Sequence, residues 1–143
     1  MSLHDAYDSE NIFAKILGGV VPSVKVYEDA QTLAFMDVFP QARGHTLVIP
    51  KIQARNLFDI AEADLQDLII KTQKVARAVR DGLNPDGVRL MQFNGDAAGQ
   101  TVFHIHFHIL PFWHGEPLKR HAAGQTADME ELNDIAALIR AKL

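Results

Sequence analysis

The chain reads His104-Ile105-His106-Phe107-His108-Ile109-Leu110 near its carboxyl end. Histidines alternate there with apolar residues. A β-strand points successive side chains to opposite faces, so this stretch predicts a strand with its three histidines on one face and its apolar residues in a core. We expect the strand to cover residues 102–110 and to end at Pro111. Three charged imidazoles on one face would repel one another, which indicates that the arrangement has a function.

Two kinds of chemistry fit such a face. Imidazole is the commonest metal ligand, but the outer two histidines would lie about 13 Å apart along a strand, so a further ligand would have to come from elsewhere. A neutral imidazole is also a nucleophile whose neighbours can bind charge and orient it. The small glycine-bearing loop at residues 94–101 precedes the histidines and can point backbone N–H groups at an anion. This combination favours attack at phosphorus.

Composition limits the class of protein. The 143 residues, 48% hydrophobic and 22% charged, are typical of one soluble globular domain. A net charge of -4 argues against a protein that binds duplex nucleic acid through a broad basic face. The lack of cysteine excludes disulfides, cysteine nucleophiles and cysteine-based metal sites. Because we find neither a signal peptide nor an apolar run of the roughly 20 residues that span a bilayer, we expect a cytoplasmic protein.

The other helices and strands are predicted from hydrophobic periodicity and from the residues that end helices or form turns. We expect helices at residues 12–17, about 59–80 and about 128–142, and strands at 24–27, 33–37, 46–49 and 88–93, besides the histidine strand. Asp59 and Glu62 have the spacing of a capping box for the long helix, and Asp81-Gly82 should end it. Short connections favour antiparallel pairing. The sequence therefore predicts an α+β domain with helices on one face of a sheet.

The histidine stretch resembles the signature of the histidine triad (HIT) superfamily, His-x-His-x-His followed by two apolar residues. Flanking segments agree with the same family, namely residues 12–16, 27–29, 33–37 and 40–51. The resemblance covers about residues 12–111, most of the chain. It implies the HIT fold, an antiparallel five-stranded sheet with packed helices, in a single domain over 1–143 with its core at about 11–112.

The resemblance also implies an enzyme, a hydrolase or transferase that attacks the α-phosphate of a purine nucleotide conjugate such as a phosphoramidate or an adenylate. His106 would be the nucleophile and form a nucleotidyl-histidine intermediate, from which water releases a nucleoside monophosphate. His104 and His108 would flank it, with His108 contacting phosphate oxygens. His45, from another strand, would support the triad, and the Thr101 hydroxyl would face the phosphate or the leaving group.

The resemblance assigns the nucleotide-binding residues as well. Asp37 matches the ribose contact, where a carboxylate accepts hydrogen bonds from two hydroxyls. The wall of the base pocket would consist of Ile12, Phe13, Ile16, Phe35 and Val38. The phosphate side would be lined by Asn94, Gly99, Gln100 and Thr101, together with His106 and His108. Relatives form homodimers with a continuous sheet, so we expect a homodimer. From the net charge and the lack of a long apolar run, we expect no nucleic acid or membrane partner.

Three positions depart from the family pattern. Phe93 stands where the family usually has an Asn or Gln that contacts ribose or phosphate, so either Asn94 supplies that contact or the site differs. Phe112-Trp113 follows Pro111 where some branches have an arginine. Some bacterial members bind zinc through Cys-x-x-Cys in the first helix and a histidine after the Pro-Lys pair. The corresponding residues here are Asn11, Ala14 and Gln53. We therefore predict no metal site and no cofactor.

Other hypotheses stay open at this point. The run at residues 98–101 and Pro111 also suit a dinucleoside polyphosphate hydrolase of the Fhit-like type. Phe93 favours a nucleotide-binding protein with weak catalysis. A metalloenzyme with histidine ligands is a further alternative. His4, His114 and His121 receive no role.

Overall fold

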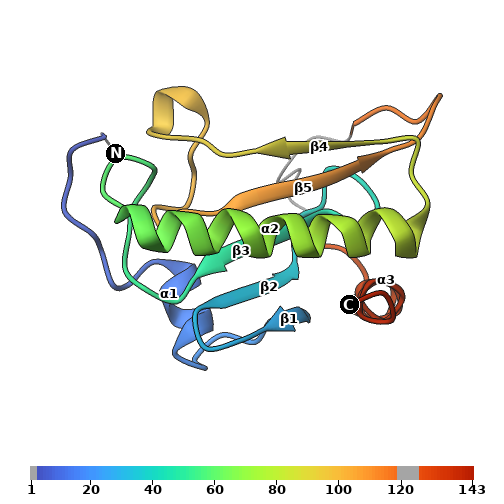
Figure 1. Cartoon of the computed structure of the whole chain (residues 1–143), viewed down its shortest axis with the longest axis horizontal. Helices are drawn as coiled ribbons and strands as arrows, with labels where there is room; N and C mark the ends of the chain where they lie inside the picture. The colour runs from blue at the N-terminus through green and yellow to red at the C-terminus, as the bar shows by residue number, and fades with distance from the viewer. Residues whose placement is uncertain (1–2, 119–125) are drawn as a thin grey trace.

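The structure, a computed structural model, describes residues 3–118 and 126–143, so His121 lies outside the described residues. Along the chain, the elements are α1 (Ile12–Leu17), β1 (Lys25–Glu28), β2 (Thr32–Met36), β3 (Thr46–Pro50), α2 (Glu62–Leu83), β4 (Gly87–Met91), the 3-10 turn η1 (Asp96–Ala98), β5 (Phe107–Phe112) and α3 (Met129–Arg140). The five strands form one antiparallel sheet in the order β1-β2-β3-β5-β4 (Figure 1). The predicted α+β fold is confirmed.

The sheet carries an apolar cluster on each face. Ala34 and Met36 of β2 belong to the larger cluster, which also contains residues of α2 and α3. Leu33 and Phe35, their neighbours on the same strand, pack with Phe13 of α1 in the second cluster. Since strand residues alternate between faces, α2 and α3 cover one face and the short α1 lies against the other. The expectation that all helices share one face is wrong, and α1 is the exception.

The histidine strand begins later and ends later than its alternation predicted. β5 starts at Phe107, so His104 and His106 precede it. Just before the strand, the backbone N–H of Ile105 donates to the carbonyl oxygen of Ala54, 2.9 Å away. At the other end, β5 continues through Pro111, which pairs with β4. β3 pairs only with residues 107–109, so no ladder bond on that side requires a proline N–H.

The long helix also differs from expectation at both ends. Asp59 does not cap it, because its carboxylate accepts the backbone N–H groups of Arg55 and Asn56 instead. At the carboxyl end, α2 continues through Gly82. A Cβ on this glycine would lie 2.6 Å from the carbonyl oxygen of Leu138, so the glycine permits close approach of α3. Among the described residues, no helix has both the length and the apolar content needed to cross a bilayer.

Candidate active site

A pocket of about 270 Å³ opens on the face of the sheet where α1 lies. It brings together most of the residues that the sequence assigned to nucleotide binding: Ile12, Phe13, Ile16, Phe35, Asp37, Val38, Thr101, His106 and His108. Its other lining residues, which no sequence motif indicated, are Val21, Pro22, Ser23, Met36, Phe39, Leu47 and Val102. The wall is therefore mostly apolar, with a carboxylate, hydroxyl groups and two imidazoles. A purine nucleoside with a phosphate has the same mixture of surfaces.

His106 is held as a neutral base. Its Nδ1 lies 2.7 Å from the carbonyl oxygen of His104, and a carbonyl can only accept, so Nδ1 carries the proton and Nε2 keeps its lone pair. Burial lowers the pKa of His106 to about 4, so the ring is uncharged at neutral pH. The edge-to-face contact with Phe13, with ring centroids 4.9 Å apart, adds to this apolar setting. A neutral imidazole with an available Nε2 is the form that a nucleophile requires.

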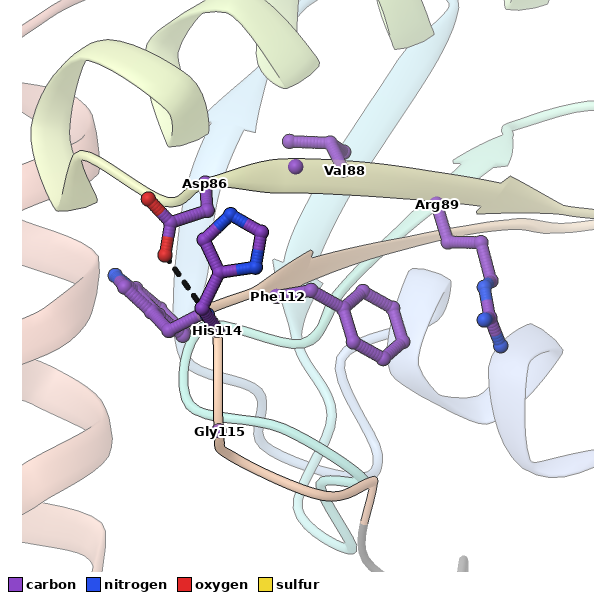
Figure 2. Close-up of a pocket in the computed structure, with 8 residues that line it drawn as sticks. Asp86, Val88, Arg89, Phe112, His114 and Gly115 are labelled. Atoms are coloured by element: carbon purple, nitrogen blue, oxygen red, sulfur yellow. Dashed lines mark hydrogen bonds between the residues drawn. The ribbon is translucent and has the colours of Figure 1, made fainter.

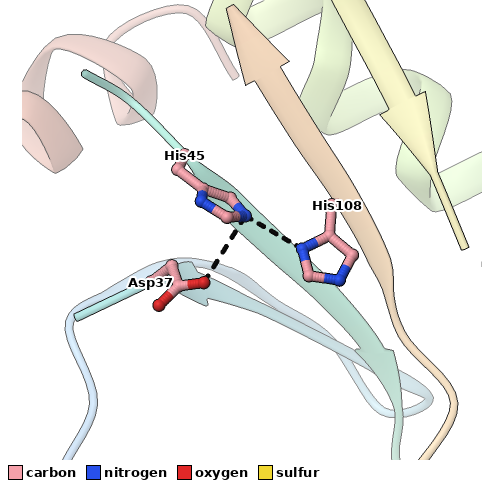
Figure 3. A group of neighbouring side chains, drawn as sticks. All are labelled: Asp37, His45 and His108. Atoms are coloured by element: carbon pink, nitrogen blue, oxygen red, sulfur yellow. Dashed lines mark hydrogen bonds and ion pairs between the residues drawn. The ribbon is translucent and has the colours of Figure 1, made fainter. Parts of the chain in front are cut away.

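Hydrogen bonds to neighbours also fix the tautomer of His108 (Figure 3). The backbone N–H of Gln41 donates to Nδ1 of His45, so in neutral His45 the proton resides on Nε2. That Nε2 lies 2.9 Å from Nδ1 of His108 and 3.4 Å from Oδ2 of Asp37. His108 accepts at Nδ1 and so, when neutral, carries its own proton on Nε2. The result is an N–H donor on the ring that lines the pocket beside His106.

The same three side chains could hold a metal ion. The ligand atoms of Asp37, His45 and His108 all lie within 4.8 Å of one another. A cation placed between them would displace the proton that His45 shares with His108, because both nitrogens would have to become ligands. The hydrogen-bonded arrangement satisfies the same atoms without an ion.

His104 occupies a different position from the other two members of the triad. It is 1% exposed and does not line the pocket. Its Nε2 donates to the carbonyl oxygen of Pro50 at 2.8 Å, and its Nδ1 lies 2.6 Å from the hydroxyl of Tyr7. Burial lowers the pKa of His104 too. Tyr7 lies in an amino-terminal segment that has no periodic pattern, so the sequence alone did not indicate this contact.

Of the predicted phosphate-side residues of the loop, Thr101 lines the pocket, whereas Asn94, Gly99 and Gln100 do not. Gln100 is buried, and its side chain accepts the N–H of Gly95 and donates to the carbonyl oxygens of Arg55 and Val102. Asn94 accepts the backbone N–H of Leu57 and exchanges amide hydrogen bonds with Gln92. Gly99 has a φ of 100°, a left-handed conformation that suits glycine. These contacts hold the loop together, and a role at the phosphate stays a prediction.

Phe93 changes the polarity beside the triad. Its ring centroid lies 5.3 Å from that of His108, with the planes tilted by 52°. Asn94 does not line the pocket, and its amide is bonded to Leu57 and Gln92 as described above. Of the two outcomes that the sequence left open, the contacts therefore favour a site that differs from the family pattern.

A larger pocket of about 470 Å³ lies where β4 meets the end of β5 (Figure 2). Phe112 and Trp113, the second departure from the family pattern, line this pocket and not the histidine pocket. The Arg89 guanidinium lies 4.5 Å from the centre of the Phe112 ring, and Asp86 accepts the backbone N–H of His114. Among the described residues that line it, none is a nucleophile bonded to a base. The histidine pocket is the better candidate for catalysis.

Comparisons with known proteins agree with this geometry. The sequence model of the HIT domain matches residues 18–114, more than half of the chain. The chain is 39% identical over 137 residues to the protein hit of Bacillus subtilis, covering 92% of this chain and 93% of that protein. It is 40% identical over 100 residues to the adenosine 5'-monophosphoramidase hnt1 of Schizosaccharomyces pombe, covering 70% of this chain and 72% of that protein.

Solved structures give the same result. The crystal structure of a Hit-like protein from Bartonella henselae is 48% identical, with a TM-score of 0.89 over 96% of this chain and 100% of that chain. A match of this extent in both sequence and fold leaves little of the chain outside the comparison. The chain belongs to the HIT domain family.

Proposed function

We propose that this protein hydrolyses purine nucleotide conjugates by attack of His106 on the α-phosphate. The observation that carries the proposal is the state of His106, a neutral ring whose Nε2 keeps its lone pair at the wall of an apolar pocket. In the first step, Nε2 forms a bond to phosphorus while the leaving group departs with the electrons of its own bond. In the second step, water cleaves the phosphorus–nitrogen bond, which releases a nucleoside monophosphate and restores the imidazole.

Other pocket residues would bind the substrate. The Nε2–H of His108 would donate to a non-bridging phosphate oxygen as negative charge develops there. Asp37 would accept the ribose hydroxyls with its carboxylate, which lies at 5% exposure in the same pocket. Phe13 and Phe35, whose rings are 5.3 Å apart, would form part of the slot for the base. This arrangement holds a purine nucleotide by its base, its sugar and its phosphate at once.

The choice of substrate class rests on a relative. The yeast protein to which the chain is 40% identical is an adenosine 5'-monophosphoramidase, so an adenosine phosphoramidate is the first substrate to test. A dinucleoside polyphosphate is the second, since it presents the same α-phosphate with a different leaving group. The ratio of kcat/KM between them assigns the preferred class.

The decisive experiment compares wild type with His106→Asn on an adenosine phosphoramidate. We expect AMP release to fall by at least about a thousandfold, because the covalent route is lost. Mass spectrometry of quenched wild-type enzyme should find a nucleotidyl group on the peptide that contains His106. His114→Asn is the matched control, since this histidine is exposed and lines the other pocket. Equal rates for wild type and His106→Asn would overturn the mechanism.

Phe93 supports a second candidate function, nucleotide binding with weak catalysis. Its ring packs against His108 where the family usually places a polar side chain. An apolar ring cannot donate to the phosphate, so the transition state would be less stabilised than in relatives. Tight AMP binding without turnover of either substrate class would favour this candidate.

We also propose that the protein forms a homodimer through β4. This strand is the last in the sheet order, so its outer backbone groups are available for pairing. A groove beside it is lined mainly by apolar side chains, including the exposed Val88 and Leu90 of β4 and Ile69 and Ile70 of α2. A second copy placed edge to edge would continue the sheet and cover these side chains.

A further inference from the structure

Tyr7 contacts the histidine triad from outside the pocket. Its hydroxyl oxygen lies 2.6 Å from Nδ1 of His104, and its ring meets the His104 ring edge-on, with centroids 5.7 Å apart. Tyr7 lies in the amino-terminal segment before α1 and does not line the nucleotide pocket. Tyr7 can therefore affect the reaction through His104 without touching the substrate.

The direction of this hydrogen bond follows from the other side of the ring. Nε2 of His104 lies 2.8 Å from the carbonyl oxygen of Pro50, which can only accept, so Nε2 carries the proton. Because burial lowers the pKa of His104, the ring is neutral and Nδ1 has a lone pair. The Tyr7 hydroxyl therefore donates to Nδ1. Burial also raises the pKa of Tyr7, which keeps that hydroxyl protonated.

Both ring nitrogens of His104 are thus hydrogen-bonded, and its backbone carbonyl group is the hydrogen-bond partner of His106, the proposed nucleophile. The His104 carbonyl oxygen accepts from Nδ1 of His106 at 2.7 Å. A shift of His104 would move this acceptor and, with it, the direction in which Nε2 of His106 points. Orientation of a nucleophile matters because displacement at phosphorus requires attack in line with the leaving group.

A buried arginine fixes the segment that carries Tyr7. Arg55 is 2% exposed, and its Nη1 donates to the carbonyl oxygen of Ala6 at 3.1 Å. Its guanidinium also lies 4.6 Å from the centre of the Phe103 ring. Arg55 therefore joins the residue before Tyr7 to the residue before His104, and the Tyr7–His104 bond lies between two anchored segments.

We propose that Tyr7 is a positioning residue, which holds His104 so that its carbonyl group orients His106 for attack. The inference rests on the proposed function, in which His106 is the nucleophile. It assigns to the amino-terminal segment a part in the reaction although the segment does not touch the substrate.

The test is Tyr7→Phe, which removes the hydroxyl and keeps the ring. The matched control is Tyr27→Phe, because the other tyrosine of the chain donates an equally short hydrogen bond, 2.6 Å to Asp29, outside the pocket. We expect the single-turnover rate of AMP release to fall about tenfold in Tyr7→Phe, while the dissociation constant of AMP changes by less than about twofold. Tyr27→Phe should leave both quantities unchanged.

A spectroscopic measurement separates this inference from the proposed function. In nitrogen-15 labelled protein, the Nδ1–H proton of His106 should shift or broaden in Tyr7→Phe and stay unchanged in Tyr27→Phe, whether or not any substrate turns over. An unchanged His106 signal in Tyr7→Phe would overturn the inference. So would a loss of rate that Tyr27→Phe reproduces, or one that a weaker affinity for AMP accounts for. A wild-type protein without turnover would instead count against the proposed function alone.

Discussion

Nε2 of His45 and Nδ1 of His108 lie 2.9 Å apart, and both rings are buried. The N–H of Gln41 occupies Nδ1 of His45, so His45 donates and His108 accepts. We expect His45→Phe to lower the single-turnover rate with an adenosine phosphoramidate by roughly tenfold or more, because Nδ1 of His108 loses its donor and the ring is free to present either tautomer.

The matched control for this variant is His114→Phe, the same substitution at an exposed histidine outside the histidine pocket (Figure 2). It should retain the wild-type rate. A second readout is the nitrogen-15 signal of His108, which should report a proton on Nε2 in wild type and a mixture of tautomers in His45→Phe. Wild-type activity in His45→Phe would show that the His45 hydrogen bond does not set the state of His108.

The low pKa of His106 predicts how stability depends on pH. Burial lowers this pKa to about 4 in the folded protein, against about 6.5 in an unfolded chain. The unfolded state therefore binds the extra proton more readily, and the free energy of unfolding decreases as pH falls through this window. Above about pH 6.5, His106 is neutral in both states and does not reduce the free energy of unfolding. By about pH 4, protonation of His106 in the unfolded chain has lowered the free energy of unfolding by on the order of 3 kcal/mol.

Urea denaturation of wild type and His106→Asn at several pH values measures that contribution. The stability of wild type should fall more steeply with decreasing pH, because asparagine does not titrate. The carbon-13 signal of the His106 ring gives a direct check, since it should remain that of a neutral ring from about pH 8 to about pH 5. A titration midpoint near the unfolded value would contradict the buried, neutral state.

The alternation of histidines predicted which side chains share a face but not where the strand begins. Ile105 and Ile109 belong to the larger core cluster, while His106 and His108 line the pocket, as a period of two requires. The ladder, however, starts only at Phe107. Before it, the N–H of Ile105 donates to the carbonyl of Ala54 instead, a contact between segments far apart in the sequence that no local pattern encodes.

Polar residues near the triad were harder to assign than apolar ones. The base-pocket residues that the family resemblance implied all line the pocket. A polar side chain can serve either a ligand or the backbone, and its residue type does not distinguish the two uses. Gln100 and Asn94 bond to backbone groups of their own loop and of residues 55–57. Tyr7 reaches His104 from 97 residues away in the chain, so only the tertiary structure brings them together.

A substitution at Gln100 can show whether its side chain serves the backbone or the ligand. Its buried amide makes three hydrogen bonds to backbone groups, and Gln100→Leu would leave those groups without their partner. We expect a loss of about 2–4 kcal/mol in the free energy of unfolding, while the folded variant binds AMP within about twofold of wild type. Gln31→Leu, at an exposed glutamine, is the control for stability. A large loss of AMP affinity with little loss of stability would instead support the phosphate role.

Asp37 is expected to bind ribose. This can be tested by removing the ribose hydroxyls of the ligand and, in parallel, changing the side chain of Asp37. Oδ1 of Asp37 accepts the backbone N–H of Phe39, which holds the carboxylate in place at the pocket wall. Wild type should bind AMP roughly tenfold more tightly than 2',3'-dideoxy-AMP, and Asp37→Asn should narrow that ratio to about twofold. Calorimetry supplies the four dissociation constants. An unchanged ratio would remove Asp37 from the ribose site, and Asp86→Asn serves as the control.

The proposed dimer makes the last prediction. Leu90 is exposed on β4, at the edge of the sheet and beside exposed apolar residues of α2. A lysine placed there would have to be desolvated on pairing, and charged residues on edge strands oppose such association. Wild type should therefore sediment with the mass of two chains, and Leu90→Lys with the mass of one. Leu138→Lys, on the exposed side of α3, introduces the same charge away from the groove and should remain dimeric. A monomeric wild type would contradict the dimer itself, whereas a dimeric Leu90→Lys would place the interface on another surface.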